Sequence, residues 1–355
     1  MKNKYFLPWS TIPLIVSLVL WFIFHQDSTI ALLSPLLNQN NPPNLTEKLN
    51  KKINTPPNLD YSSSTSVASI PKSVSYLLYS PLTGRVYYAN NPTTKIYPAS
   101  FTKLMTAIVA LDTASVNQLI STTTNSITKE PTVLGLKINE QLSVSELIRG
   151  SISTSANDAA ATLADGISTI YGQNLDYFIS LMNQKAKLMN MNNTHFINAE
   201  GYHDDNQYST LEDLYILVHN VQQNYPEIIK AGKADREDLT VTSTHGFYYL
   251  PNWNGLLGIY PGVNGLKIAY TEKSAYSTII TSTRNDHSVN LILIGADTLK
   301  SRDYFAALLL DFAYQKEKIP PIELTEKDLQ KRYDSWNELA QKIKAELSAP
   351  KKQPK

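Results

Sequence analysis

The sequence predicts a mixed α/β (α+β) fold, with one antiparallel sheet packed by helices and a mostly helical lobe inserted between its N- and C-terminal strands. Two patterns predict it. The stretch 74–88 is rich in residues that favour strands, and strand-like runs with a period of two occur between 248 and 295. Between them, residues from about 101 to 235 carry mostly helical signals. Because strands bracket helices, we expect a cleft between the sheet and the lobe.

Local signals predict the individual elements in chain order. A hairpin is expected at 74–79 and 85–88, with its turn at Pro81-Leu82-Thr83-Gly84. Two capping boxes, Ser143-Val144-Ser145-Glu146 and Ser209-Thr210-Leu211-Glu212, are expected to open helices. The other expected elements are helices at 157–170 and 174–190, strands at 248–250, 265–271, 276–283 and 290–295, and a helix that follows Arg302 and runs through Phe305, Leu308, Leu309 and Phe312.

Composition excludes several classes of site. The chain has 355 residues and a formal net charge of +1, so no general attraction to nucleic acid is expected. It has no cysteine, which excludes disulfides and thiolate zinc sites and fits an exported protein. Its six histidines show no metal-binding spacing. We therefore expect no metal, no cofactor and no nucleic-acid partner.

The first 26 residues predict a membrane anchor or a signal peptide. Lys2 and Lys4 precede a mostly apolar run over 5–24, and about 20 such residues can cross a bilayer as a helix. No further lysine occurs before Lys48, so we expect a single-pass protein whose bulk is extracytoplasmic. No clear cleavage site follows, which favours an uncleaved anchor; the alternative is a cleaved signal and a secreted protein.

Three further segments follow the segment 1–26. Residues 27–68 are rich in Asn, Pro, Ser and Thr and predict a flexible extracytoplasmic linker. The ordered domain is expected over 69–318. Residues 319–355 predict an amphipathic helix and a basic tail, with apolar side chains at Leu329, Tyr333, Trp336, Leu339, Ile343 and Leu347. We expect this helix to pack on its own domain or a partner helix, with membrane-surface contact as the alternative.

The best candidate for a reactive group is Ser100, in the segment Pro98-Ala99-Ser100-Phe101-Thr102-Lys103. Apolar residues follow it at helical spacing, so Ser100 is expected in the first turn of a helix, on the same face as Lys103. A helix start presents free N–H groups that favour an oxyanion. A lysine in a dry pocket loses its proton readily and can deprotonate a serine. Ser-x-x-Lys recurs at Ser69 and Ser126, but without the helix.

Two more pieces follow Ser100 in order. Ser155-Ala156-Asn157 lies in the helical lobe, and Lys267 lies on a predicted strand. Each short pattern is weak alone, because Ser-x-Asn recurs elsewhere in the chain. The ordered set, with its element types, is far more specific.

With these motifs the chain resembles the serine D-alanyl-D-alanine carboxypeptidases, the low-molecular-mass penicillin-binding proteins, which have a β-lactamase/transpeptidase-like fold. The resemblance covers about residues 73–316, which makes 69–318 the expected catalytic domain. Besides the three motifs, it rests on the segments 98–107, 157–160, 195–201, 208–210 and 252–257.

The resemblance implies a role for each matching residue. Ser100 would be the nucleophile, Lys103 its general base, and Ser155 a proton relay. Asn157 would bind the peptide backbone of the substrate together with Ser155. These roles describe an acyl-enzyme on Ser100.

It also implies how the substrate is held. Lys267 would keep Lys103 neutral and attract the substrate carboxylate. Backbone N–H groups of Ser100 and Tyr270 would hold the oxyanion. Arg302 matches the arginine that helps bind the terminal carboxylate, a task that suits a bidentate guanidinium.

One motif departs from the family. Its Lys-Thr-Gly is Lys267-Ile268-Ala269 here, so a hydroxyl that would hydrogen-bond the substrate carboxylate is missing. Such a bond is worth roughly 1.5–3 kcal/mol, or about tenfold to a hundredfold in turnover. Thr271 is a candidate substitute. The change of Ser-Gly-Asn to Ser-Ala-Asn is milder.

The resemblance therefore implies a membrane-tethered D,D-carboxypeptidase that trims peptidoglycan stem peptides in cell-wall biosynthesis and cell-shape control, with β-lactams as covalent inhibitors. A D,D-endopeptidase shares every motif. A non-catalytic or weakly active peptidoglycan- or penicillin-binding protein is the alternative that Ile268 favours. A β-lactamase would need a loop glutamate between Asn157 and Lys267, and none is convincing.

Overall fold

The computed structural model describes residues 45–348. The expected anchor at 1–26, the linker up to residue 44 and the basic end of the tail lie outside these residues. Among the helices in the described part, none combines the length and apolarity needed to cross a bilayer.

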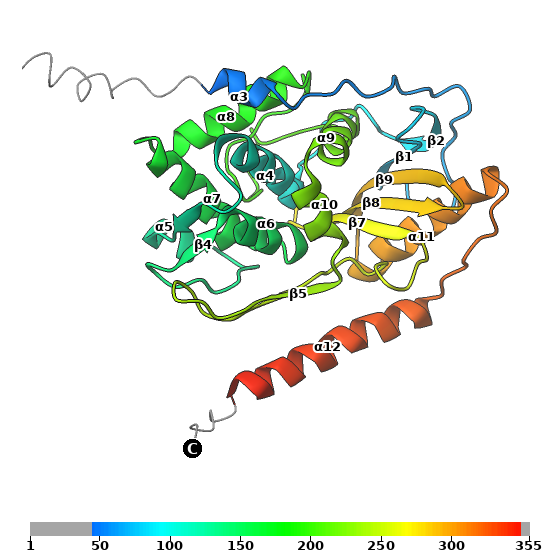
Figure 1. Ribbon diagram of the computed structural model, residues 1–355. Helices are drawn as coiled ribbons and strands as arrows, with labels where there is room; N and C mark the ends of the chain where they lie inside the picture. The colour runs from blue at the N-terminus through cyan, green and yellow to red at the C-terminus, as the bar shows by residue number, and fades with distance from the viewer. Residues whose placement is uncertain (1–44, 349–355) are drawn as a thin grey trace, which may run out of the picture. The chain divides into compact units, whose positions relative to one another are not determined.

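The predicted sheet forms from both ends of the domain (Figure 1). Its five strands are antiparallel and follow the spatial order β2-β1-β9-β8-β7. They are β1 Ser75–Tyr79, β2 Val86–Asn90, β7 Val263–Ala269, β8 Tyr276–Arg284 and β9 His287–Ala296. The N-terminal hairpin thus joins the C-terminal strands through the pairing of β1 with β9, as the sequence predicts. The strand β7 lies at one edge of the sheet.

Alternate side chains of the sheet enter two different cores. On β1, Leu77 and Tyr79 pack into the core shared with the helical lobe. Their neighbours Tyr76 and Leu78 pack into a second core with helix α11, Leu299–Lys316. Since β1 is buried on both faces, its apolar run is nearly continuous.

The helical lobe occupies the middle of the chain, as predicted. Its elements are η3 Ala99–Phe101, α4 Thr102–Thr113, α5 Thr124–Ile127, α6 Val144–Ser153, α7 Asn157–Ile170, α8 Leu175–Leu188, α9 Leu211–Asn224 and α10 Pro226–Lys233. Two small hairpins accompany it: β3 Leu119–Ser121 with β4 Gln141–Ser143, and β5 Arg236–Leu239 with β6 Tyr248–Pro251.

One of the two predicted capping boxes is present. The Ser143 hydroxyl accepts from the Glu146 N–H at 3.2 Å, and the Glu146 carboxylate accepts from the Ser143 N–H at 2.8 Å. The other prediction is wrong by one residue, because α9 is capped by Thr210. Ser209 pairs its backbone with Ile96 instead and is therefore not part of the helix end.

The described part of the expected linker is packed on the domain. Residues 45–61, here called the N-terminal strap, include helix α3, Thr46–Asn50. Leu45 and Leu49 are buried in the core. The Lys185 ammonium donates to the Leu49 carbonyl at 2.6 Å. A few apolar residues and backbone hydrogen bonds thus fix a segment whose polar composition predicts a free tether.

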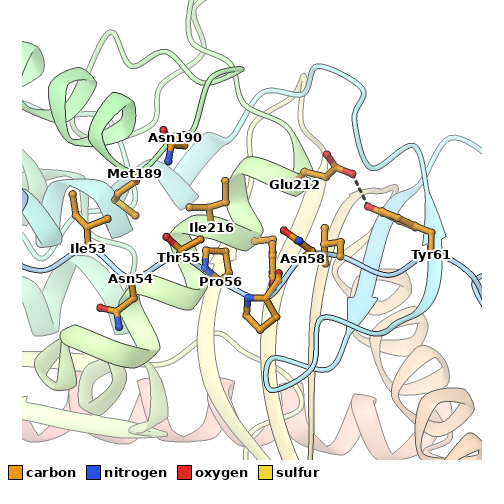
Figure 2. A pocket seen from close by; sticks show the side chains of 13 residues that line it. Ile53, Asn54, Thr55, Pro56, Asn58, Tyr61, Met189, Asn190, Glu212 and Ile216 are labelled. Carbon is orange, nitrogen blue, oxygen red and sulfur yellow. Dashed lines mark hydrogen bonds between the residues drawn. The ribbon is translucent and has the colours of Figure 1, made fainter.

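The strap also covers a pocket of about 410 Å³ next to α8 and α9, shown in Figure 2. The Tyr61 hydroxyl donates to the Glu212 carboxylate at 2.7 Å on one side of it. The Tyr215 hydroxyl donates to the Pro57 carbonyl at 2.6 Å. These contacts fasten the strap to α9.

Helix α12, Glu326–Ser348, lies where the sequence predicts an amphipathic helix. Leu329, Trp336 and Ile343 on it are buried. The Trp336 ring meets Trp253 edge-on, with 5.4 Å between ring centroids. The helix therefore packs on its own domain.

Candidate active site

Ser100 and Lys103 lie where η3 passes into α4. The Lys103 amine is 3.1 Å from the Ser100 hydroxyl oxygen. Ala99 has a left-handed backbone with φ 45°, which is uncommon for a residue other than glycine. Gly201 packs against this turn, since a Cβ built on it would lie 2.0 Å from the Ala99 carbonyl oxygen. A strained turn and a close glycine therefore fix the nucleophile candidate.

The Lys103 amine is fully buried and has three partners. The Asn157 side-chain carbonyl accepts from it at 2.7 Å, and the Glu200 backbone carbonyl accepts from it as well. A neutral amine has two hydrogens and one lone pair. Two carbonyl acceptors use the hydrogens, and the lone pair remains for the Ser100 hydroxyl.

Burial lowers the pKa of Lys103 to about 7, against the opposing effect of the Glu200 and Asp158 carboxylates. Burial also holds the pKa of Lys267 well below its usual range, helped by the positive charges of Lys103 and Arg302. Burial, rather than a second cation, is thus the main reason that Lys103 can lose its proton. The two amines are best treated as one coupled pair.

Ser155 and Asn157 lie at the start of α7. Ser155 has a left-handed backbone with φ 64°. The Asn157 amide donates to the Glu130 carbonyl at 2.8 Å, while its carbonyl faces Lys103. The structure thus brings Asn157 to the Ser100–Lys103 pair.

A cavity of about 500 Å³ joins these groups. Four of the predicted site residues line it: Ser100, Ser155, Asn157 and Tyr270. The other lining residues are Glu130, Pro131, Thr132, Glu200, Gly201, Tyr202, Ile268, Thr271 and Glu272. Among residues 45–348, no group of three His, Cys, Asp or Glu side chains could hold a metal ion.

The strand wall of the cavity carries the unusual motif. Lys267 is buried, and its amine donates to the Ile268 carbonyl at 2.9 Å. Ile268 lines the cavity, and Ala269 is buried in the core. Thr271 lines the cavity as well, and its hydroxyl is 2.9 Å from the Ser274 hydroxyl in a turn. The wall is therefore apolar where the family has a hydroxyl.

Arg302 does not lie at the cavity, where the resemblance implies that it binds the substrate carboxylate. The residue is 1 % exposed and does not line the cavity. It pairs bidentately with the Asp303 carboxylate at 2.8 and 2.9 Å, and it donates to the Trp253 carbonyl at 2.9 Å. Because its neighbour Asp303 binds the fork of the guanidinium, a substrate carboxylate cannot meet that fork in this arrangement.

Tyr270 is half exposed, and its ring packs on Tyr276 at 4.5 Å between centroids. It follows β7 directly, and β7 contacts η3, which carries Ser100. The oxyanion site at the N–H groups of Ser100 and Tyr270 stays a prediction.

Sequence reasoning missed two residues that organise this site. Glu200 contributes its carbonyl to Lys103, and its carboxylate pairs with Lys129 at 3.1 Å. The Asp158 carboxylate accepts from three successive N–H groups, 134–136, at 2.9–3.1 Å, and so holds the loop that follows the cavity residues 130–132. The sequence did contain a signal for Asp158, because this acidic residue directly follows the Ser-x-Asn motif.

Known proteins are similar to this chain over much of its length. The model of the D-alanyl-D-alanine carboxypeptidase family matches residues 62–298. D-alanyl-D-alanine carboxypeptidase DacF of Bacillus subtilis is 29% identical over 245 residues, 68% of this chain and 61% of that protein. DacA of Escherichia coli is 27% identical over 280 residues, 75% of this chain and 67% of that protein. The chain thus spans about three fifths to two thirds of the length of these relatives.

Solved structures show the same fold. Penicillin-binding protein 5 from Haemophilus influenzae has a TM-score of 0.63 at 26% identity, over 70% of this chain and 73% of that one. The Streptomyces K15 DD-transpeptidase has a TM-score of 0.64 at 22% identity, over 71% of this chain and 99% of that one. The predicted fold class is therefore confirmed.

Proposed function

The chain belongs to the D-alanyl-D-alanine carboxypeptidase family, and on that premise we propose that it is a serine D,D-carboxypeptidase that removes the terminal D-alanine from peptidoglycan stem peptides. One observation carries the proposal. The buried Lys103 amine lies 3.1 Å from the hydroxyl of Ser100, which lines the cavity. A base with a pKa near 7 is close to ideal for deprotonating a serine at neutral pH.

The proposed reaction has two halves. The Ser100 oxygen attacks the carbonyl carbon of the penultimate D-alanine, and its proton passes to Lys103. The tetrahedral oxyanion is held by the N–H groups of Ser100 and Tyr270. The C–N bond then breaks, and the leaving amine takes a proton, relayed through Ser155, to depart as D-alanine. Water repeats the sequence on the acyl-enzyme and frees Ser100.

The cavity walls suggest how the peptide is held. The Asn157 side chain lies between Lys103 and the cavity, so its amide can also meet the substrate backbone. At the edge of the sheet, β7 can pair with an extended peptide, since adding a strand satisfies its open hydrogen-bonding groups. The terminal carboxylate would face Ile268, with the positive charge of the Lys103–Lys267 pair behind it.

The place of action is part of the same proposal. The apolar run over 5–24 supports an N-terminal membrane anchor, with the catalytic domain on the extracytoplasmic side. Peptidoglycan would then be its partner and β-lactams its covalent inhibitors. Protease accessibility of the domain in intact cells tests the orientation.

The test is covalent labelling together with product release. A fluorescent penicillin should label the wild type and fail to label Ser100→Ala, and the wild type should release D-alanine from a stem pentapeptide. Absence of label on both proteins would reject the acyl-enzyme.

A second candidate is a penicillin-binding protein with little or no turnover. It is favoured by Ile268, which presents an apolar side chain to the cavity where a hydroxyl would bind the carboxylate. Labelling without D-alanine release would support this candidate. Cleavage of a cross-linked dimer into its two stem peptides, without D-alanine release from a pentapeptide, would instead indicate an endopeptidase.

A further inference from the structure

Three neighbouring side chains in the middle of helix α12 contact the domain: Arg332, Tyr333 and Trp336. The Tyr333 hydroxyl donates to the Asp303 carboxylate at 2.8 Å. One turn further on, Trp336 packs edge-on against Trp253. Arg332 pairs with Asp235, which precedes β5. The three partners, Asp235, Trp253 and Asp303, come from three different segments of the domain.

Tyr333 completes a buried network. Asp303 is fully buried and accepts from both Arg302 and Tyr333. Gly255 leaves room for this contact, because a Cβ there would lie 2.0 Å from an Asp303 carboxylate oxygen and 3.2 Å from the Tyr333 ring. The tyrosine is thus fitted to Asp303 at a position that tolerates no larger neighbour.

The same network reaches β7. Arg302 donates to the Trp253 carbonyl, and the Asn254 amide donates to the Gly265 carbonyl at 3.3 Å. Gly265 is two residues before Lys267 on β7. The Arg302 charge also acts on Lys267, whose pKa it helps to lower. A continuous series of contacts therefore joins α12 to the strand wall.

We propose that Tyr333 of α12 is a positioning residue for the active site, which fixes the Asp303–Arg302 pair and thereby holds Lys267 and the β7 edge ready to receive the substrate carboxylate. The proposal rests on the proposed carboxypeptidase function. It concerns a helix outside the residues 62–298 that match the family, so the family pattern does not account for it. Tyr333 acts through Asp303 and does not touch the cavity.

The test compares two variants of the full chain that each remove one buried tyrosine hydroxyl. Tyr333→Phe loses the bond to Asp303, whereas Tyr314→Phe loses a 2.8 Å bond from α11 to Ser282, away from Asp303. For acylation by penicillin, we expect Tyr333→Phe to raise the half-saturating concentration about threefold to tenfold. The maximal acylation rate should change by less than about twofold. Tyr314→Phe should change neither value.

A second measurement needs no activity. In lysine labelled with ¹³C at the ε carbon, NMR titration follows each amine directly, and the Lys267 signal is assigned by its loss in Lys267→Arg. Tyr333→Phe should raise the Lys267 pKa, because a less firmly held Arg302 repels the ammonium less. Tyr314→Phe should leave it unchanged.

The outcomes separate the two proposals. If the wild type reacts with penicillin but Tyr333→Phe behaves like Tyr314→Phe in both measurements, Tyr333 has no positioning role and the carboxypeptidase proposal stands. If the wild type does not react, the carboxypeptidase proposal fails, and the titration decides alone whether α12 controls Lys267. A fall in the maximal rate with unchanged half-saturation would also overturn the positioning role.

Discussion

The two walls of the cavity differ in how their polar groups are used. On the helical wall, the Lys103 amine meets Ser100, Asn157 and the Glu200 carbonyl, so all of its hydrogen-bonding capacity is engaged around the reacting hydroxyl. On the strand wall, Ile268 faces the cavity, and the Lys267 amine donates to a carbonyl of its own strand. One wall is organised for proton transfer, and the other has lost a group for binding a carboxylate.

This difference separates two steps of the proposed reaction. A general base contributes typically 10²–10⁴ in rate, whereas one hydrogen bond to a charged group contributes about tenfold to a hundredfold. A chain can therefore lose the hydroxyl of the strand wall and still form an acyl-enzyme. Loss of the helical wall would remove the reaction itself.

The largest effect should come from the helical wall. Replacing the base by Lys103→Met should slow acylation by fluorescent penicillin about 10²–10⁴-fold, because nothing then takes the Ser100 proton. Stopped-flow or gel-based labelling measures the rate. Lys273→Met, at an exposed lysine beyond β7, is the control and should react like the wild type. A rate for Lys103→Met within tenfold of wild type would contradict its role as the base.

A substitution in the strand wall should raise the rate of D-alanine release instead of lowering a rate. Ile268→Thr restores a hydroxyl at the cavity and should increase D-alanine release about tenfold to a hundredfold through tighter carboxylate binding. Ile268→Val has the same branched shape without the hydroxyl and should change little. Equal rates for the two variants would show that shape, not the hydrogen bond, limits this wall.

The pH dependence of acylation should follow the protonation of Lys103 on the helical wall. The reaction needs the neutral Lys103 amine, whose pKa is about 7. Below that pH the amine is protonated, so the rate should fall about tenfold for each further pH unit. Above it, the rate should level off. A rate that stays constant from pH 7 down to pH 5 would exclude an amine with this pKa as the base.

The smallest effect should come from the carboxylate beside Lys103. The negative charge of Glu200 raises the pKa of Lys103, so its removal in Glu200→Gln should lower that pKa. The acid limb of the pH profile should move to lower pH, by less than about one unit. Glu130→Gln, at another cavity carboxylate, should leave the limb in place. A shift to higher pH in Glu200→Gln would show that its effect is not electrostatic.

The fold and the helical wall could be predicted because their signals are local. Ser100 and Lys103 are one helical turn apart, so their meeting follows from the apolar spacing of a single helix. Asn157 required the ordered motifs as well, since it comes from another helix. Glu200 contributes its backbone carbonyl. Every residue has a backbone carbonyl, so the sequence gives no sign of this role.

The corrections concern contacts between distant segments. Arg302 was expected at the cavity, but its adjacent Asp303 binds it, and Tyr333 and Gly255 stabilise that arrangement from elsewhere in the chain. The strap was expected to be free, because its composition is polar. Leu45 and Leu49 enter the core of the lobe, and hydrogen bonds from Lys185 and Tyr215 to strap carbonyls help to hold it there.

The position of β7 at the end of the sheet has a consequence for solubility. A strand with an open row of backbone groups is a template on which sister copies can assemble, and proteins usually shield such rows. Here η3 and α10 contact β7, so these elements limit the approach of a second folded copy, which is bulkier than the extended peptide of the proposed substrate. Variants that loosen either element should therefore be watched for self-association as well as for lost reactivity.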